Sequence, residues 1–351
     1  MKSIIAVLIL LGGYFFLPAS EEINTSKSVT IIEKDEGGGN LSDEDKTNSS
    51  ISIRDNQEEE EVRKPITKGK SIPPKCVYII HEDEDGKRLT FPSSVFFETV
   101  KNEIYLIDSG NSRILIYTFD FFHLYTIDKD DGIFAPTCMT VDPDGYLFVG
   151  QSRDSTNSRA RISVFNPCLK WERNIYFGGF IGAEKFVPKN IALDDEGNIY
   201  LAGTNHLGIV VLDKGGAYQN TFMPERIAIC DVEIDEKGNI YLLSEEWGKV
   251  YIYDKSGGLV VEFGEKGGGS GKLSRPRGFS VDASRGRVYV IDYMRHTANV
   301  YDTNGSYLFE FGGKGWGKGW FQFPSDICID RKGHVLIADT FNNRVQVLEI
   351  K

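Results

Sequence analysis

The chain has little of the cysteine and histidine on which disulfide-stabilised and zinc-dependent proteins rely. Only 5 cysteines and 5 histidines occur among its 351 residues. An odd number of cysteines spread along a chain is not a disulfide framework, so we expect buried reduced thiols, with one bond as the alternative. No two histidines have the His-x-x-x-His spacing of a helical zinc site. These absences argue against a disulfide scaffold and against a catalytic zinc.

The motifs of common hydrolytic and nucleotide-binding sites are also missing. The sequence has no Gly-x-Ser-x-Gly elbow, and no glycine-rich phosphate loop leads into a helix. Glycines are abundant at 264–271 and 312–319, but both stretches lie between predicted strands. We therefore interpret these glycines as parts of connecting loops, and not as a phosphate site.

Near the N-terminus, an apolar run is too short to span a membrane comfortably. It covers residues 4–17, follows Lys2 and precedes Pro18-Ala19-Ser20, whereas a spanning helix needs about 20 residues. Residues 1–20 therefore predict a secretory signal peptide, with an N-terminal membrane anchor as the alternative. No cysteine follows the run, which argues against a bacterial lipid anchor. We expect an extracytoplasmic protein: secreted, periplasmic, or held at the outer face of a membrane by this segment alone.

The next segment, residues 21–70, lacks aromatic residues altogether. It is acidic and rich in polar residues, so it cannot bury enough apolar surface to fold and predicts a disordered linker. The whole chain has a net charge of −11. An acidic protein is a poor partner for nucleic acid or for an anionic membrane surface. RNA binding is therefore disfavoured.

What the sequence does contain is one phrase repeated six times. Its fullest copies are residues 188–202 and 324–339, a third copy covers residues 276–292, and looser copies begin at Pro92, at Pro136 and around Ile229. The same position of the phrase is occupied by Tyr105, Phe148, Tyr200, Tyr241, Tyr289 and Leu336. A spacing in the forties, combined with short β-type runs, indicates a radial array of β-sheets.

Each repeat predicts a small antiparallel sheet of four strands. A turn such as Asp194-Asp-Glu-Gly-Asn198 joins the first two strands. Such a sheet hides its faces only by stacking against its neighbours around an axis. The last copy ends after its third strand, and the extended run 76–80 precedes the first copy. We predict that this run pairs beside residues 344–350, completes the last sheet and closes the ring.

Two glycine-rich stretches carry a family resemblance. Residues 312–325, followed by Asp339-Thr-Phe-Asn-Asn-Arg-Val-Gln-Val347, resemble the NHL-repeat signature, and residues 264–276 are a second match. The resemblance covers roughly residues 75–351 and implies an all-β, six-bladed NHL-type β-propeller over 71–351. It implies no single function, because the family includes sensors, RNA binders, ligase substrate-recognition domains and amidating lyases.

The amidating lyases of this superfamily hold zinc with histidines, one of which directly follows the proline of the repeat. At that position this chain has Ser93, Thr137, Lys189, Arg277 and Ser325. The departure argues against the zinc chemistry of those relatives.

The first strand of each repeat would line the central channel, and several of its polar residues are acidic. Asp231, Glu233 and Asp326, together with Asn190, offer oxygen ligands to a hard cation such as calcium. The alternative is that these groups bond backbone amides and trapped water. A cation here would suit a metal-dependent hydrolase or lyase acting at the channel, which is the alternative function; otherwise we expect no cofactor.

The connecting loops suggest a binding surface at the rim. The candidate ligand-binding residues are Trp316, Trp320, Trp247, Lys314 and Arg277. Aromatic and basic side chains on loops suit a protein, peptide or glycan partner. We expect Phe321 and Leu273, in contrast, to plug the gaps between blades. The favoured function is a monomeric, non-enzymatic binding or scaffold protein.

A repeated spacing of five residues joins Asp108 to Arg113 and Asp339 to Arg344. It predicts ion pairs that brace a turn. An isolated, exposed pair of this kind would stabilise the fold by only about 0–1 kcal/mol.

Overall fold

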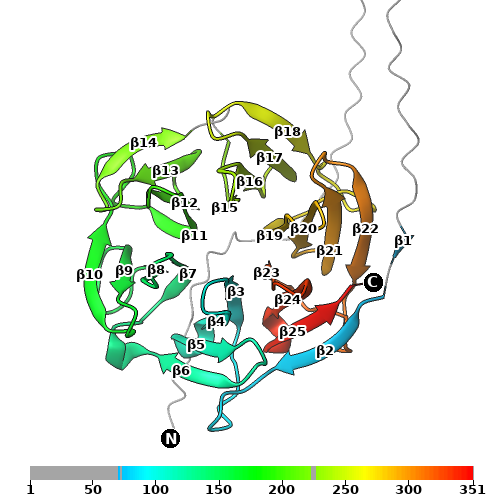
Figure 1. Cartoon of the computed structure of the whole chain (residues 1–351), viewed down its shortest axis with the longest axis horizontal. Helices are drawn as coiled ribbons and strands as arrows, with labels where there is room; N and C mark the ends of the chain where they lie inside the picture. The colour runs from blue at the N-terminus through cyan, green and yellow to red at the C-terminus, as the bar shows by residue number, and fades with distance from the viewer. Residues whose placement is uncertain (1–69, 72, 223–226, 351) are drawn as a thin grey trace, which may run out of the picture. The chain divides into compact units, whose positions relative to one another are not determined.

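The computed structural model describes residues 70–71, 73–222 and 227–350 of the chain. In these residues the strands form six antiparallel sheets arranged as blades around a central axis (Figure 1). The fold is therefore all-β and a six-bladed β-propeller, as the repeats indicated. The predicted signal peptide and almost all of the predicted linker lie outside the described residues. Within the described part of the chain, none of the helices is long and apolar enough to cross a membrane.

Each blade contains four strands, which follow one another from the axis outward. Blade 1 consists of β3 (Pro92–Glu98), β4 (Glu103–Asp108), β5 (Arg113–Thr118) and β6 (His123–Ile127). Blade 2 consists of β7 (Pro136–Val141), β8 (Leu147–Gln151), β9 (Arg161–Phe165) and β10 (Trp171–Tyr176). Blade 3 consists of β11 (Val187–Leu193), β12 (Ile199–Thr204), β13 (Ile209–Leu212) and β14 (Tyr218–Phe222).

The second half of the ring repeats this order. Blade 4 consists of β15 (Asp231–Ile234), β16 (Ile240–Ser244), β17 (Lys249–Tyr253) and β18 (Leu259–Phe263). Blade 5 consists of β19 (Pro276–Asp282), β20 (Arg287–Asp292), β21 (Thr297–Asp302) and β22 (Tyr307–Gly312). Blade 6 consists of β23 (Asp326–Ile329), β24 (His334–Asp339), β25 (Arg344–Glu349) and β2 (Lys75–Ile80). Short 3-10 turns lie at η1 (Ser109–Asn111), η2 (Lys129–Asp131) and η3 (Thr340–Asn342).

The sixth blade combines the two ends of the described chain. β2 pairs antiparallel with β25, with Ile80 opposite Val345 and Lys75 opposite Glu349. This is the pairing that the sequence indicated for residues 76–80. A further two-residue strand, β1 (Lys70–Ser71), pairs parallel with β22 at the outer edge of blade 5.

The turns between first and second strands form through the aspartate and glycine chemistry that the repeats predicted. Asp194 Oδ1 accepts the backbone N–H of Glu196 at 2.9 Å and that of Asn198 at 2.8 Å. Gly197 then takes a φ of 81°, in the left-handed region that favours glycine. This Asp-x-x-Gly chemistry fixes the register of β11 against β12.

Hydrophobic side chains fill the spaces between neighbouring blades. Leu273 has no exposed surface and packs among residues of blades 4 and 5. Phe321 is equally buried among residues of blades 5 and 6. Both are the inter-blade plugs that the sequence predicted.

All five cysteines fall within the described residues, and all are free thiols. Cys138, Cys230 and Cys328 are buried, as expected, whereas Cys168 is exposed. Burial raises the pKa of the Cys138 thiol to about 12, which makes it unreactive at neutral pH.

The repeated Asp–Arg pairs form as the spacing predicted, but their carboxylates are buried. Asp108, Asp292 and Asp339 are completely buried. Asp339 accepts hydrogen bonds from Gln322 N at 2.7 Å and Arg344 Nε at 2.8 Å, and also from Asn342 Nδ2 at 2.8 Å. The aspartate therefore ties the strand end, the preceding connector and the next turn together. The ion pairs predicted from the spacing are therefore present, but they belong to buried networks, because connectors from outside the repeat cover the carboxylates.

Candidate functional site

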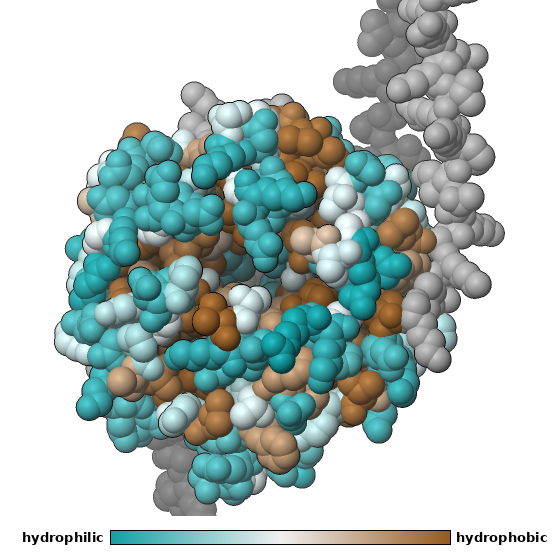
Figure 2. Space-filling model, viewed as in Figure 1, coloured by the Kyte–Doolittle hydropathy of each residue, from teal (hydrophilic) through white to brown (hydrophobic). Residues whose placement is uncertain are grey.

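One end of the propeller collects the long loops of every blade. Neighbouring strands in a blade are antiparallel, so the start of the first strand and the end of the second lie at the same end of the propeller. The segments that lead into each blade therefore lie at the same end as the loops between second and third strands. We call this end the connector face; the short turns lie at the opposite face. Figure 2 shows one face of the molecule, on which hydrophilic and hydrophobic patches surround a central hollow.

Four aromatic rings form a continuous row on the connector face. Phe91 contacts Phe341 with ring centroids 5.4 Å apart, and Phe341 contacts Phe323 at 5.0 Å. Phe323 contacts Tyr293 at 4.9 Å, and the guanidinium of Arg277 lies over the Tyr293 ring at 4.1 Å. The row crosses blades 1, 6 and 5. Phe91 and Phe341 are nearly half exposed, at 45% and 47%. We call these four rings the aromatic row.

Two rings of the row sit on strained backbone. Phe91 has a φ of 49° and Phe323 a φ of 47°, the left-handed region that a bulky side chain rarely adopts. Each such residue costs about 1–2 kcal/mol. Neighbouring side chains hold the conformation: Phe91 N donates to Asn343 Oδ1 at 2.8 Å, and Phe323 N donates to His296 Nδ1 at 2.9 Å. Strain of this kind is concentrated at functional sites.

Positive charge lies at the end of the aromatic row. Arg275 donates to the carboxylate of Glu245, and Lys189 Nζ lies 3.9 Å from the same group. Burial alone would raise the pKa of Glu245, but the hydrogen bond from Arg275 and the charge of Lys189 lower it overall. Arg277 Nε is buried without a hydrogen-bond partner among the described residues. Two cations therefore contact the Glu245 carboxylate while Arg277 lies on the Tyr293 ring, which leaves an excess of positive charge.

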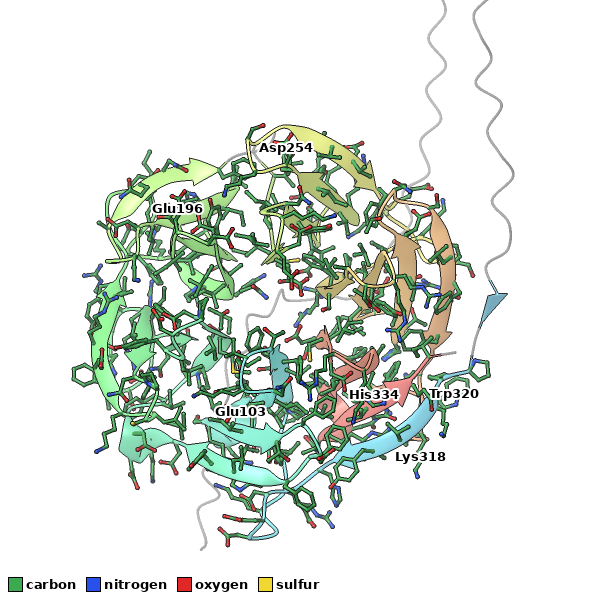
Figure 3. All side chains as sticks on the ribbon, viewed as in Figure 1. Glu103, Glu196, Asp254, Lys318, Trp320 and His334 are labelled. Atoms are coloured by element: carbon green, nitrogen blue, oxygen red, sulfur yellow. The ribbon has the colours of Figure 1, made fainter. Side chains whose placement is uncertain are left out.

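The structure does not bring the residues predicted for the rim into one cluster. Trp316, Trp320 and Lys314 lie on the connector between β22 and β23, and Trp320 stands at the outer edge beside β2 (Figure 3). Trp247 belongs to the loop between β16 and β17, and Arg277 lies on the innermost strand of blade 5. The three tryptophans are strongly exposed, at 77%, 52% and 54% for Trp316, Trp320 and Trp247. Arg277 alone joins the aromatic row.

Sequence reasoning missed the row itself, although a signal was present. Phe91 and Phe323 each directly precede the proline that opens a repeat, and Phe341 occupies the turn after β24. An aromatic residue before that proline in only two of the blades was the available clue.

The acidic residues predicted for the channel lie on its innermost strands and bond the next blade. Asp231 Oδ2 accepts Phe279 N, and Glu233 Oε2 accepts Val281 N, both at 2.9 Å. Asp326 repeats the pattern on Val95 N at 2.9 Å. Burial raises the pKa of all three carboxyls: that of Glu233 to about 8, that of Asp326 to about 6, and that of Asp231 well above its usual value.

These bonds support the alternative that the sequence left open, in which the acids hold backbone amides. In the described part of the chain, no three His, Cys, Asp or Glu side chains are grouped as a metal site requires. Asn190 lies on β11 and is half-buried. The calcium site therefore stays a prediction.

Calcium titration tests that prediction directly. A cation that binds only the folded chain must raise the Tm progressively with its concentration. Glu233→Gln removes one charged ligand, so the calcium-dependent shift should shrink in this variant. An unchanged Tm at millimolar calcium, or an equal shift in Glu233→Gln, would rule out the proposed channel cation.

Comparisons with known proteins agree with this architecture. The family model described as NHL repeat matches residues 321–348, which run from the plug Phe321 through β25. The chain is a six-bladed β-propeller that contains an NHL repeat. No curated protein gives a significant match to its sequence.

Solved structures share the propeller fold at low sequence identity. An auxiliary nutrient binding protein from Bacteroides ovatus superposes with a TM-score of 0.58 at 16% identity, covering 80% of this chain and 76% of that one. Virginiamycin B lyase from Staphylococcus aureus superposes with a TM-score of 0.53 at 13% identity, covering 75% of this chain and 96% of that one. Hydrazine synthase from Kuenenia stuttgartiensis superposes with a TM-score of 0.53 at 15% identity, covering 76% of this chain and 97% of that one. At these identities the NHL-repeat propeller shares with them its fold and nothing more.

Proposed function

We propose that this NHL-repeat propeller is a non-enzymatic binding protein that works outside the cytoplasm and recognises a protein, peptide or glycan through its connector face. The observation that supports this most is the aromatic row, which crosses three blades and ends at Arg277. Aromatic and arginine side chains supply most of the energy at binding surfaces. A row held in place by strained backbone is also preorganised, which lowers the entropy lost on binding.

The charge at the end of the row indicates what the ligand carries. Lys189, Arg275 and Arg277 outnumber Glu245, so a ligand with an apolar face and an oxygen-rich or anionic group fits best. The same fold occurs in proteins described as auxiliary nutrient binding proteins from two Bacteroides species, which is consistent with a binding role. The N-terminal apolar segment supports delivery outside the cytoplasm.

Binding of the purified protein to glycan and peptide arrays tests the proposal, with Phe341→Ala as the decisive variant. Phe341 is half exposed, so its loss should leave the fold intact and weaken binding by about tenfold or more. Phe122→Ala is the matched control, because Phe122 is 72% exposed in a turn at the opposite face. Equal binding by both variants would contradict the proposal.

Two further measurements separate the remaining alternatives. The double variant Trp316→Ala, Trp320→Ala tests whether the outer loop contributes to the surface, as the sequence predicted. If the chain were instead a metal-dependent hydrolase or lyase, a chelator would abolish turnover, and a metal that survives dialysis would accompany the purified protein.

A further inference from the structure

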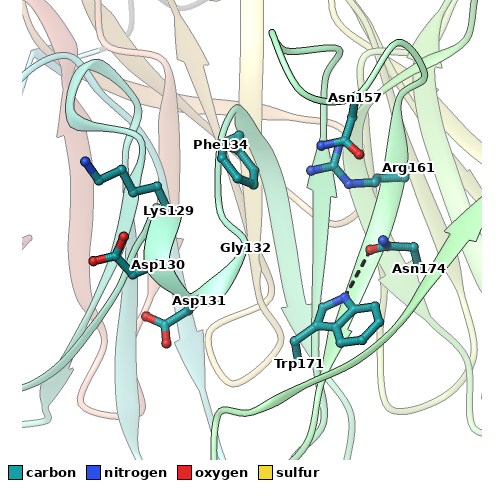
Figure 4. Close-up of a pocket in the computed structure, with 9 residues that line it drawn as sticks. All are labelled: Lys129, Asp130, Asp131, Gly132, Phe134, Asn157, Arg161, Trp171 and Asn174. Atoms are coloured by element: carbon teal, nitrogen blue, oxygen red, sulfur yellow. Dashed lines mark hydrogen bonds between the residues drawn. The ribbon is translucent and has the colours of Figure 1, made fainter.

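A separate pocket of about 420 Å³ opens on the outer part of blade 2 (Figure 4). Its size falls within the range of about 300–1,000 Å³ that is usual for small-molecule sites. Lys129 and Asp131 of η2 line one side, and Arg161 of β9 lines the other together with Trp171 and Asn174 of β10. None of the aromatic row, the rim tryptophans or the channel acids belongs to it. The pocket therefore goes beyond the function proposed above.

The connector that precedes blade 2 is shorter than those that precede blades 5 and 6. Residues 128–135 join β6 to β7, whereas residues 264–275 and 313–325 make the same connection before blades 5 and 6. The longer connectors fold back over the third strand of their blade. The short connector does not reach that far, so the corresponding space in blade 2 is left open.

Arginines at the start of the third strand in other blades bind carbonyl oxygens of the preceding segment. Arg113, Arg161 and Arg344 each begin the third strand of a blade. Nη2 of Arg344 donates to the backbone oxygens of Gly317 and Trp320, at 2.8 and 3.0 Å, and Nη2 of Arg113 donates to Lys87 O at 3.1 Å. In both cases the acceptor lies on the segment that precedes the blade.

Arg161 has lost these acceptors. Its side chain is only 2% exposed, and Nη1 donates to Asp154 Oδ2 at 3.2 Å. Among the described residues, the partner of its guanidinium is this carboxylate, and not a carbonyl oxygen of the preceding connector. The Arg161 guanidinium therefore lines a pocket at the place where connector carbonyl oxygens accept from the equivalent arginines of blades 1 and 6. A ligand that brings acceptor oxygens would replace them.

The wall behind the arginine is preorganised by a hydrogen-bonded chain. Gln151 Nε2 donates to Gly132 O at 3.1 Å and to Ser163 Oγ at 2.7 Å. Ser163 Oγ donates to Asn174 Oδ1 at 2.7 Å, and Trp171 Nε1 donates to the same oxygen at 3.3 Å. This chain fixes the amide of Asn174 and the indole of Trp171 at the pocket edge.

We propose that the blade 2 pocket binds a neutral saccharide residue. Trp171 is 52% exposed and offers an indole for the apolar face of a sugar ring. Arg161 donates to ring or hydroxyl oxygens, and the carboxylates of Asp130 and Asp131 accept from hydroxyl groups. The two acids balance Lys129 and Arg161 within the lining, and Asp154 behind Arg161 adds one negative charge, so the pocket has no excess of positive charge. Donors, acceptors and an aromatic face without excess positive charge match a polyhydroxylated, uncharged ring better than an anion.

The test uses glucose, galactose, N-acetylglucosamine, maltose and cellobiose as probes, with glucuronate as the charged comparison. Saturation-transfer NMR and calorimetry on the purified protein should detect at least one neutral sugar. Trp171→Ala should weaken it by about tenfold or more, the scale of one strong aromatic contact. Phe122→Ala is the control, because Phe122 is an exposed aromatic residue in a turn of blade 1, outside both binding surfaces, and its loss should leave sugar binding unchanged.

A second variant keeps Trp171 and closes the pocket. Replacing residues 128–135 with the sequence of residues 313–325 should supply connector carbonyls to Arg161 and abolish sugar binding, and a thermal melt checks that the variant folds. No binding by any neutral sugar, binding of glucuronate alone, or equal affinity in Trp171→Ala would overturn the proposal. Phe341→Ala should leave sugar binding in the blade 2 pocket intact. A failure of the pocket proposal can therefore be distinguished from a failure of the connector-face proposal.

Discussion

Replacing Asp339 with alanine is expected to destabilise the propeller by roughly 3–5 kcal/mol, the cost of breaking a buried charge pair from one side. The carboxylate has no exposed surface and accepts hydrogen bonds from Gln322, Asn342, Arg344 and Gln346. Alanine leaves those donors unsatisfied and the Arg344 charge unpaired. The loss should be visible in urea denaturation as a lower midpoint with an unchanged slope.

Asp302→Ala provides the matched control for that experiment. Asp302 also accepts two backbone amides, from Asn304 at 3.0 Å and Ser306 at 2.8 Å, but it does so in a surface turn. Water can satisfy those amides once the side chain is gone, so the loss should be far smaller. Equal losses in the two variants would show that the buried network contributes no more than an ordinary turn.

Stability is expected to fall as the pH rises from about 5 to about 8, and Glu233→Gln should remove part of that fall. The folded chain holds the pKa of Glu233 at about 8, above its usual value of 4.5, chiefly through burial. The folded state therefore binds the proton more tightly than the unfolded state does. Its contribution is complete below the unfolded pKa and is lost as the pH rises through the folded one.

The shift sets an upper limit of about 4–5 kcal/mol on the gain from Glu233→Gln above pH 8. Glutamine keeps an oxygen that can accept Val281 N, so the bond to blade 5 survives. Urea unfolding across this pH range measures the effect, and Glu196→Gln is the control, because Glu196 is exposed on a turn (Figure 3). A pH slope identical to that of the wild-type chain in Glu233→Gln would show that this carboxyl ionises freely in the channel.

The two predictions distinguish acids with opposite effects on the fold. Asp339 faces an arginine and amide donors, so its negative charge is stabilised where it lies. Asp231 is buried and Glu233 half-buried in the channel, and both lie near the negative charge of Asp326, so ionisation is unfavourable there. A bound cation would instead favour the ionised form of Glu233 and Asp231. Calcium titration and the pH series therefore examine the same groups.

The sequence determined the fold because the repeat is a local signal. Period, turn chemistry and apolar alternation recur within each group of forty or so residues, and each copy specifies the same small sheet. The plugs Phe321 and Leu273 followed from the same pattern, since equivalent positions in a ring face equivalent gaps. The pairing of β2 with β25 followed from counting strands.

Only the tertiary structure decided where binding surfaces form. Phe91 and Phe341 stand 250 residues apart in sequence and touch because the ring brings blade 1 beside blade 6. The buried Asp339 network and the open pocket beside Arg161 likewise depend on how far each connector reaches over its neighbour. A repeat pattern describes what the blades have in common, whereas these sites arise where blades differ and meet, so they depend on contacts between distant segments.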